Sequence, residues 1–304
     1  MEVIRPKKLE QGDTIGILAV SGEIKDIEKI NNAKNFLENK GYSVIISDTC
    51  YKSHRYMAGE SDEDCVKEIH KFFEDSSINA ILCARGGYGT LRLIDKIDWD
   101  VIKNNPKIFA GYSDITVLLS MIYKKCGLVT FHSPMAKGDF GDEINEYTQD
   151  MFFKTLQGKT SRIEAQYSKV YYDGIANGVL WGGNLSSIVS LIGSDFIPDE
   201  EIILFLEDLN EPAYKIDKML TQIFNTPELN DRIRGIALGE FINIENDYWL
   251  KNIFAEIAQK VKMPMADGFK FTHEKIKDTV PYGVKASFDA NRGQILIQGD
   301  YVTC

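Results

Sequence analysis

The sequence of 304 residues contains few of the residues that build metal centres and disulfide frameworks. Its five cysteines are scattered and form no Cys-x-x-Cys pair, and its four histidines show no His-x-x-x-His spacing. An odd number of scattered cysteines is typical of free thiols in a reducing compartment. The sequence therefore predicts neither a zinc cluster nor a disulfide scaffold.

Long apolar runs and an excess of positive charge are also missing. No run approaches the roughly 18 apolar residues that a membrane-spanning helix needs, and residues 1–8 lack the apolar stretch of a signal peptide. Lys and Arg number 35 against 45 Asp and Glu, a net charge of −10, which argues against a nucleic-acid partner. We expect a cytoplasmic protein that binds neither membranes nor nucleic acid. A small anionic substrate is still compatible, because its site needs only one or two local cations.

The first half of the chain alternates short apolar runs with amphipathic stretches. The unbroken apolar run Thr14–Val20 is typical of a strand covered on both faces. Further short strands are expected at Ser43–Ile46, Ala80–Cys83, Ile108–Ala110 and Leu128–Phe131. Helical periodicity between them predicts a parallel sheet with helices on both faces. In such sheets ligands bind beyond the carboxyl ends of the strands, so the loops that follow the strands are the candidate site.

The second half is less regular, and its length and composition predict a second domain of mixed α/β type. We expect an N-terminal domain over residues 1–155, a polar linker over 156–172 and a C-terminal domain over 173–304. Apolar segments at Ile202–Leu206 and Ile236–Phe241 are expected as strands. Residues 284–288 and 295–298 are expected to form a terminal hairpin.

Ser113 lies at the corner between an expected strand and an expected helix, in Gly111-Tyr112-Ser113-Asp114. A nucleophile in this position stands clear of the backbone, near free N–H groups that stabilise an oxyanion. The five-residue Gly-x-Ser-x-Gly pattern is incomplete, because Ile115 occupies its last position. The alternative is that Ser113 or Asp114 only caps the following helix, and the spacing leaves both interpretations open.

The segment Arg85-Gly86-Gly87-Tyr88-Gly89 follows the third expected strand. Its backbone N–H groups could cradle an anion or supply an oxyanion hole beside Ser113. It is neither a Gly-x-Gly-x-x-Gly fingerprint nor a phosphate loop with Gly-Lys-Ser/Thr, so nucleotide binding is not favoured by this motif. A tight turn that simply requires glycine is the alternative.

Two carboxylates and two histidines are the other candidates for chemistry. Glu207 and Asp208 end an apolar strand, where one of them could orient a histidine or both could cap the helix that follows Pro212. His273 lies in a loop, and His132 follows the fifth expected strand. The chain order Ser, Glu, His also occurs in the α/β-hydrolases, but here a different domain would supply the acid and the base.

The motifs together resemble the LD-carboxypeptidases of the serine peptidase type, a family that includes murein tetrapeptide carboxypeptidases and microcin C self-immunity proteins. The resemblance spans nearly the whole chain. It rests on matches in order and spacing at residues 12–16, 58–59, 84–91 (ARGGYGTL), 111–118 (GYSDITVL), 131–134, 182–185 and 204–220 (LFLEDLNEPAYKIDKML).

The resemblance implies a catalytic role for each matching position. Ser113 would be the nucleophile, His273 the general base and Glu207 the acid that orients it, with the backbone N–H groups of Asp114 and Gly87 as the oxyanion hole. It also implies a flavodoxin-like, or class I glutamine amidotransferase-like, N-terminal domain and a smaller C-terminal domain. Family members are usually cytoplasmic homodimers without a metal, so we expect no cofactor.

The implied reaction is release of the terminal D-alanine from murein tetrapeptides, as in peptidoglycan recycling. Two alternatives stay open: amide cleavage of an aminoacyl-nucleotide, and a non-catalytic muropeptide-binding protein. The candidates for substrate contacts are Arg85, Gly86, Trp181 and Asn184, of which Arg85 would bind the terminal carboxylate. In an aminoacyl-nucleotide enzyme, Trp181 would stack on adenine.

The chain departs from the family pattern at two places. Many members have Pro-Ser after the first strand, where this chain has Val20-Ser21, and many have Gly-His at the catalytic histidine, where this chain has Thr272-His273. A β-branched residue replaces a flexible glycine in the second case, so the geometry around His273 is the feature most affected.

Overall fold

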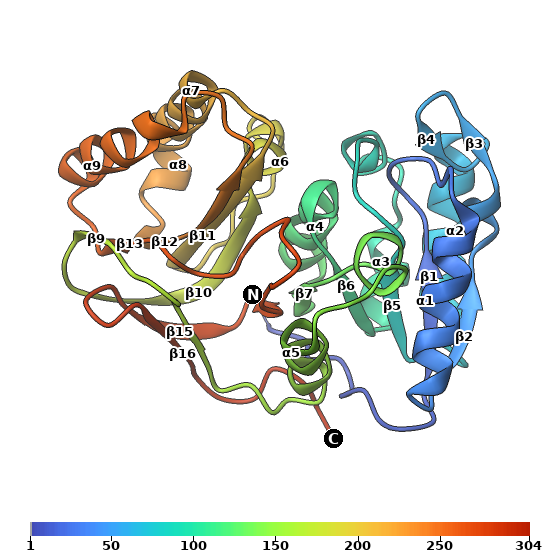
Figure 1. Cartoon of the computed structure of the whole chain (residues 1–304). Helices are drawn as coiled ribbons and strands as arrows, with labels where there is room; N and C mark the ends of the chain where they lie inside the picture. The colour runs from blue at the N-terminus through green and yellow to red at the C-terminus, as the bar shows by residue number, and fades with distance from the viewer. Residues whose placement is uncertain (1) are drawn as a thin grey trace. The chain divides into compact units, whose positions relative to one another are not determined.

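The computed structural model describes residues 2–304, which fold as two units (Figure 1). Unit 1 contains residues 2–159, Thr279–Tyr282 and Asp300–Cys304, and unit 2 contains Thr160–Asp278 and Gly283–Gly299. Within this described part of the chain, no helix combines the length and the apolar character needed to cross a membrane.

Unit 1 is built on a six-stranded sheet in the order β14-β7-β6-β5-β1-β2. Five strands are parallel: β1 (Thr14–Leu18), β2 (Ser43–Ile46), β5 (Ala80–Cys83), β6 (Ile108–Gly111) and β7 (Thr130–His132). The edge strand β14 (Val280–Tyr282) is antiparallel to β7. A separate two-stranded ladder joins β3 (Ser53–His54) to β4 (Met57–Ala58). The five strands expected from the apolar runs are confirmed, with shifts of up to two residues at their ends.

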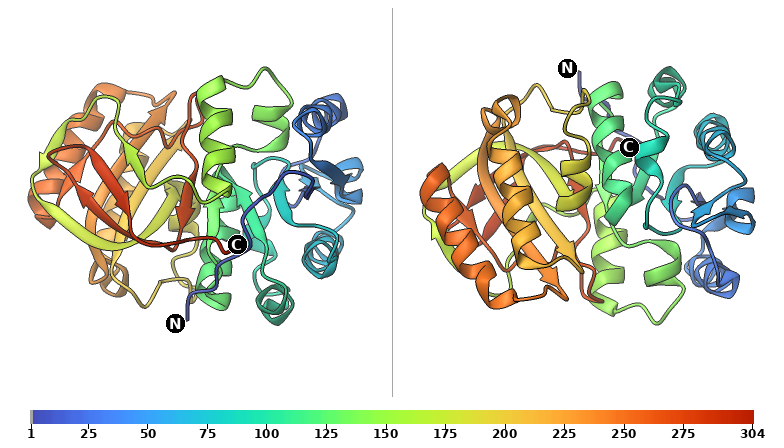
Figure 2. Two further views of the ribbon diagram at one scale, coloured as in Figure 1. Left: turned by 90° about the horizontal axis from the view of Figure 1, so that it is seen from below. Right: turned by 90° about the horizontal axis from the view of Figure 1, so that it is seen from above.

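Helices cover both faces of this sheet (Figure 2). On one face α2 (Asp62–Glu74), α3 (Trp99–Asn104) and α4 (Thr116–Cys126) pack one against the next. On the other face α1 (Ile27–Asn39) packs against the π-helix η4 (Ala136–Phe140), which contacts α5 (Glu146–Leu156) through aromatic rings. Short 3₁₀ turns follow three of the strands: η1 (Asp48–Tyr51), η2 (Thr90–Arg92) and η3 (Ser113–Ile115).

The ends of two helices follow from local chemistry in the sequence. Ser61 caps α2, because its hydroxyl accepts a hydrogen bond from Asp64 N at 3.1 Å. The helix α4 ends at Gly127, whose φ of 72° lies in the left-handed region that glycine tolerates.

Unit 2 contains an eight-stranded mixed sheet in the order β8-β16-β15-β10-β11-β12-β13-β9. The central strands β10 (Ile175–Asn184), β11 (Ile202–Leu209), β12 (Ile233–Ile242) and β13 (Met265–Ala266) are parallel. The outer strands β8 (Arg162–Glu164), β9 (Val170–Tyr172), β15 (Lys285–Asp289) and β16 (Gln294–Ile297) pair antiparallel. The expected hairpin is thus formed by β15 and β16.

The helices of unit 2 follow its central strands in the sequence: one follows β10, two follow β11 and one follows β12. They are α6 (Leu185–Ser190), α7 (Ala213–Phe224), α8 (Pro227–Asn230) and α9 (Leu250–Val261), with the 3₁₀ turn η5 (Asp247–Trp249) before the last. The helix α7 packs against each of the other three.

The domain boundaries differ from the expected ones. The presumed linker 156–172 contains β8 and β9, which extend the unit 2 sheet at its two edges. Two segments of the expected C-terminal domain, 279–282 and 300–304, belong to unit 1. Edge strands of three residues are too short to show a period-two pattern, and strand pairing over long sequence separation leaves no local signal.

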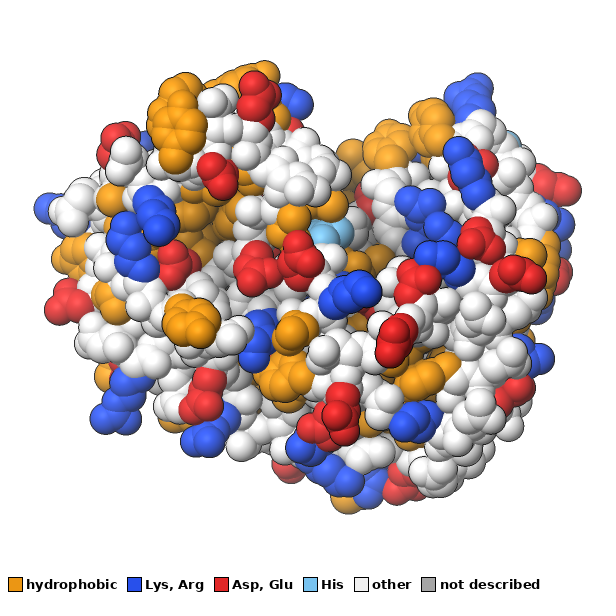
Figure 3. Space-filling model, viewed as in Figure 1, with side chains coloured by type: hydrophobic (Ala, Val, Ile, Leu, Met, Phe, Trp, Pro, Cys, Tyr) orange, Lys and Arg blue, Asp and Glu red, His pale blue; other side chains and the backbone are white. Residues whose placement is uncertain are grey.

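The surface carries both signs of charge. On the face drawn in Figure 3, Lys and Arg side chains are interspersed with Asp and Glu side chains on each unit. The acidic side chains therefore form no single patch on this face, and local groups of cations are compatible with the net negative charge.

One buried contact within unit 1 gives a stability prediction. Tyr282 of β14 and Ser120 of α4 are both buried, and their hydroxyls lie 2.7 Å apart. Tyr282→Phe should lower the free energy of unfolding by about 1 kcal/mol, because it removes a buried hydrogen bond. Urea denaturation measures this change. Tyr51→Phe, at a side chain that is 60% exposed, is the control and should be neutral; equal midpoints for both variants would contradict the prediction.

Candidate active site

Ser113 occupies the turn between β6 and α4 with a backbone φ of 64°. A non-glycine residue in the left-handed region stores strain, and such strain is concentrated at functional sites. Neither η3 nor α4 has a side-chain cap hydrogen bond at its N-terminus. The N-cap positions of these two helical segments are Tyr112 and Ile115, so the capping alternative for Ser113 or Asp114 stays open beside the nucleophile interpretation.

The Asp114 side chain joins three loops at the carboxyl ends of the strands. It accepts hydrogen bonds from Ser21 Oγ at 2.6 Å and from Thr90 N at 3.1 Å. Thr90 Oγ1 also donates to the backbone oxygen of Asp114 at 2.7 Å. All three residues are buried. Asp114, the residue after Ser113, thus connects the loops that follow β1, β5 and β6.

The glycines of the Arg85–Gly89 loop are needed for close packing against Ser113. A Cβ on Gly86 would lie 2.7 Å from Ser113 Cβ and 2.8 Å from Ser113 Oγ, so no side chain fits there. Gly87 has a φ of 130°, and a Cβ on it would lie 3.0 Å from Gly22 Cα. The backbone of this loop therefore lies directly against the candidate nucleophile.

Arg85 has a more structural environment than the sequence suggested. Its Nε donates to Gly86 O at 2.9 Å, and its Nη1 donates to Glu23 O at 3.1 Å. Gly22 N in turn donates to Gly86 O at 3.2 Å. The guanidinium is therefore fixed in position by two backbone carbonyls, which neutralise none of its charge.

In unit 2, Glu207 and His273 form a buried pair. His273 Nδ1 lies 2.7 Å from Glu207 Oε2, and the side chains are 13% and 0% exposed. A carboxylate at this distance selects the tautomer with hydrogen on Nδ1, so that Nε2 is the atom that accepts a proton. The structure thus brings together the two unit 2 residues of the expected triad.

Asp208, next to Glu207, has a different role. Its carboxyl accepts hydrogen bonds from Asn184 Nδ2 at 3.1 Å, from Ser186 N at 2.9 Å and from Leu209 N at 2.8 Å. Burial and the neighbouring charge of Glu207 raise the pKa of Asp208 to about 7. The alternative that these carboxylates cap α7 is wrong, because α7 starts after Pro212 without a side-chain cap.

Two candidates for substrate contacts turn out to be packed inside unit 2. Trp181 is fully buried, and its ring lies 5.7 Å from that of Phe196. A ligand could stack on Trp181 only after its neighbours had moved. Asn184 caps α6 by accepting from Ser187 N at 3.1 Å, and its amide donates to Asp208. This capping role explains the residue without a substrate.

His132, the other candidate base, lies within β7 and is buried. It pairs with Val280 of β14, and its ring meets Tyr112 edge-on at 6.0 Å. A sheet position of this kind suits packing. His273, with its carboxylate partner, fits the role of a general base better.

The residues that anchor the His273 loop were not predicted from the sequence. Thr272 Oγ1 donates to Glu240 Oε2 at 2.6 Å and accepts from Glu274 N at 3.0 Å. Glu240 N also donates to Phe271 O at 2.9 Å. Thr272 is the position where glycine was expected from the family pattern. Its hydroxyl contacts Glu240 on β12 and the backbone of Glu274, the residue that follows His273. The sequence flagged this departure but not its partner on β12.

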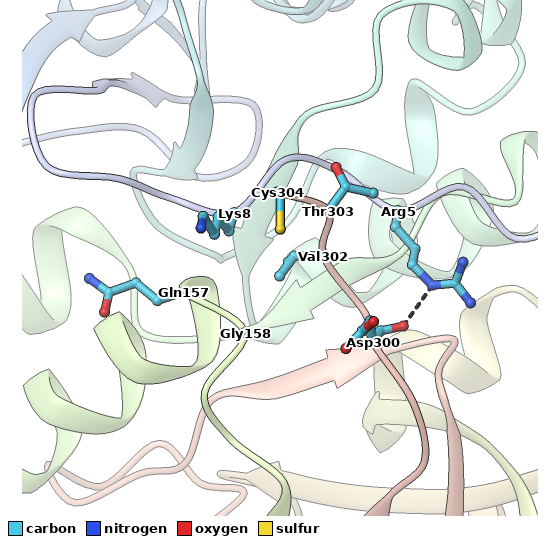
Figure 4. A pocket seen from close by; sticks show the side chains of 8 residues that line it. All are labelled: Arg5, Lys8, Gln157, Gly158, Asp300, Val302, Thr303 and Cys304. Carbon is cyan, nitrogen blue, oxygen red and sulfur yellow. Dashed lines mark hydrogen bonds between the residues drawn. The ribbon is translucent and has the colours of Figure 1, made fainter.

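One cavity of unit 1 is unrelated to the candidate residues. A cavity of about 540 Å³ lies near the chain ends in unit 1, where Arg5 Nε donates to Asp300 O at 2.6 Å (Figure 4). It contains none of the candidate residues. Among residues 2–304, no three His, Cys, Asp or Glu side chains are grouped as metal ligands.

Comparisons with known proteins identify the family. The LD-carboxypeptidase N-terminal domain matches residues 15–133, and the LD-carboxypeptidase C-terminal domain matches residues 177–288. A probable murein peptide carboxypeptidase of Bacillus subtilis (strain 168) is 35% identical, covering 97% of this chain and 94% of its own. The chain therefore belongs to the LD-carboxypeptidase family, as the motifs indicated.

Two further relatives carry different names. The microcin C7 self-immunity protein MccF of Escherichia coli is 27% identical over 97% of this chain and 96% of its own. A structure of MccF in complex with glutamyl sulfamoyl guanosine matches with a TM-score of 0.90 and 24% identity, covering 98% of this chain and 99% of that one. The muramoyltetrapeptide carboxypeptidase of Oxalobacter formigenes matches with a TM-score of 0.83 and 28% identity, covering 95% and 100%. The mixed α/β architecture with a parallel sheet and two units is thus shared with both.

The Thr272–Glu240 hydrogen bond gives a prediction about carboxypeptidase activity. Thr272→Val keeps the side-chain shape but removes the hydroxyl, so His273 should lose part of its alignment. We expect kcat to fall about tenfold with KM unchanged, since small misplacements of a reacting group are costly. Steady-state kinetics measure both constants.

The controls use the same pair. Thr272→Ser keeps the hydroxyl and should retain the activity of the parent protein. Glu240→Ala should lower kcat to a similar extent, and the double variant Thr272→Val/Glu240→Ala should be no worse than either single one, because both remove the same bond. Additive losses would refute the coupling.

Asp208 gives a prediction about pH. Its pKa is about 7 in the folded protein and about 3.9 in an unfolded chain. Near pH 5 the folded protein therefore keeps a proton on Asp208 that the unfolded chain has lost. The stability that this proton contributes is complete below the unfolded pKa and is lost as pH rises through 7. Between pH 5 and pH 8 the protein should lose about 2 kcal/mol more stability than Asp208→Asn. Urea denaturation at the two pH values tests this, and parallel losses would contradict it.

Proposed function

We propose that this protein is a serine carboxypeptidase that releases the terminal D-alanine from murein tetrapeptides. The observation that carries the proposal is the buried Glu207–His273 pair, with Nδ1 and Oε2 2.7 Å apart. A carboxylate that fixes a histidine in this way prepares it as a general base. The carboxypeptidase names of the relatives support the substrate class.

In the proposed mechanism, Ser113 and His273 act on one substrate with Glu207. His273 Nε2 takes the proton from Ser113 Oγ as the oxygen attacks the amide carbonyl, and Glu207 stabilises the imidazolium that forms. The protonated histidine then gives its proton to the leaving D-alanine amine. Water, deprotonated by the same histidine, hydrolyses the acyl-enzyme and restores the serine.

The oxyanion hole is proposed to consist of the backbone N–H groups of Asp114 and Gly87. The hydrogen bonds of the Asp114 side chain and the close packing of Gly86 on Ser113 support this, because they fix the backbone that would donate. Preorganised donors of this kind each lower a barrier by about 3 kcal/mol. We also propose that the catalytic protein is a homodimer with a flavodoxin-like N-terminal unit. The strand order β2-β1-β5-β6-β7 supports the fold assignment.

A second candidate function is cleavage of the amide in an aminoacyl-nucleotide. The likeness to MccF over nearly the full chain favours it, and the same serine, histidine and carboxylate would perform the chemistry. The two functions differ in the group that leaves, D-alanine in one case and a nucleotide derivative in the other.

The test is mass spectrometry of a murein tetrapeptide after incubation with the protein and with Ser113→Ala. The protein should remove one alanine, and Ser113→Ala should lower the rate at least a thousandfold, because loss of the nucleophile leaves only residual catalysis. Ser77→Ala, at an exposed serine outside the candidate site, is the control and should be fully active.

Each other result excludes one part of the proposal. Cleavage by Ser113→Ala at the original rate would exclude Ser113 as nucleophile. No cleavage of the tetrapeptide by the original protein, together with cleavage of an aminoacyl sulfamoyl adenosine, would replace the first function by the second.

A further inference from the structure

Lys137 lies beside the loop that packs against Ser113. It belongs to the π-helix η4, and its backbone N–H donates to Ala84 O at 2.8 Å. Ala84 directly precedes Arg85, so two cationic residues start from neighbouring points of the backbone. The π-helix itself is fixed from within, because Met135 N donates to the buried Asp139 side chain at 2.8 Å.

The two cations have no acidic partner among the residues that the structure describes. Arg85 is bonded to the carbonyls of Gly86 and Glu23. The nearby Lys29 has its own partner, since its Nζ lies 2.7 Å from Asp142 Oδ2. Lys137 has no such ion pair, and burial together with the charge of Arg85 lowers its pKa. Asp26 and Asp142 act on it in the opposite sense but more weakly.

Like charges near each other in a partly buried position destabilise each other, and an anion that binds both removes this cost. The protein as a whole is acidic, with a net charge of −10, so this local excess of positive charge is not a general property of its surface. Its position also matters, because Arg85 is fixed to Gly86 and Gly86 lies against Ser113.

We propose that Lys137 and Arg85 bind the C-terminal carboxylate of the substrate and so restrict the protein to the last residue of a peptide. This inference rests on the proposed carboxypeptidase function and adds the specificity-determining residue Lys137. The free carboxylate lies only one residue beyond the scissile bond in such a substrate. A cation pair anchored to the loop at Ser113 is in the right part of unit 1 to hold it.

The kinetic test compares a tetrapeptide acid with its C-terminal amide. Lys137→Met, which keeps the apolar stem and removes the charge, should raise KM for the acid about tenfold or more and leave kcat nearly unchanged, because a charge-assisted bond to the ground state is lost. The amide should be a poor substrate for both proteins, with no further loss in the variant. Lys137→Arg should retain most of the activity on the acid.

Lys34→Met is the matched control, since Lys34 pairs with Glu38 on the surface of α1 at 3.7 Å. It should behave as the unmodified protein. Equal losses on acid and amide in Lys137→Met would show a structural role and overturn the proposal. Unchanged kinetics on the acid would overturn it as well.

A binding experiment separates this proposal from the proposed function. NMR titration with acetyl-D-alanine and with its amide needs no turnover. The protein should bind the acid at least tenfold more tightly than the amide, and Lys137→Met should abolish the difference. If the protein releases no alanine but shows this preference, the reaction assignment fails and the carboxylate site stands. Equal affinity for the acid and the amide would overturn the carboxylate site. So would tight binding of AMP by a protein in which the acid and the amide do not displace each other.

Discussion

The Asp114 side chain is hydrogen-bonded to two loops other than its own, and the arrangement around Ser113 depends on these bonds. A buried carboxylate is tolerated when donors satisfy its oxygens, and Ser21 Oγ and Thr90 N do so at 2.6 and 3.1 Å. The strained backbone of Ser113, with a φ of 64°, is retained because relaxing it would displace Asp114 and leave the carboxylate unsatisfied. The close approach of Gly86 to Ser113, and the position of Arg85, follow from the same anchored loops.

Unit 2 also contains buried carboxylates that accept hydrogen bonds, in this case two adjacent ones at the end of β11. Glu207 Oε2 lies 2.7 Å from His273 Nδ1, and Asp208 accepts hydrogen bonds from two backbone N–H groups and the Asn184 amide. The raised pKa of Asp208 follows from burial and from the charge of Glu207. The bond between Thr272 and Glu240 then fixes the loop that carries the histidine. The geometry of one imidazole thus depends on contacts from β10, β11 and β12.

The sequence predicted what local chemistry controls and missed what long-range pairing controls. The strands at Ser43–Ile46 and Ala80–Cys83 were found with their observed bounds. The second is buried along its whole length, and buried parallel strands are unbroken apolar runs. The edge strand β14 contains Pro281 and pairs with β7, and nothing in its own residues indicates that partner. Trp181 was expected at the ligand as an aromatic ring that could stack on adenine, but sequence does not reveal whether an aromatic ring is exposed. Lys137, the proposed carboxylate ligand, was not predicted because only the fold places it beside Ala84 and Arg85.

The central claim is that Ser113 is a nucleophile activated by His273. Covalent labelling with a fluorophosphonate, followed by peptide mapping, tests it without assuming a substrate. We predict a single adduct on Ser113 and a labelling rate that falls at least a hundredfold in His273→Ala, since the hydroxyl then has no base. An adduct at another residue, or equal labelling of Ser113 with and without His273, would contradict the account.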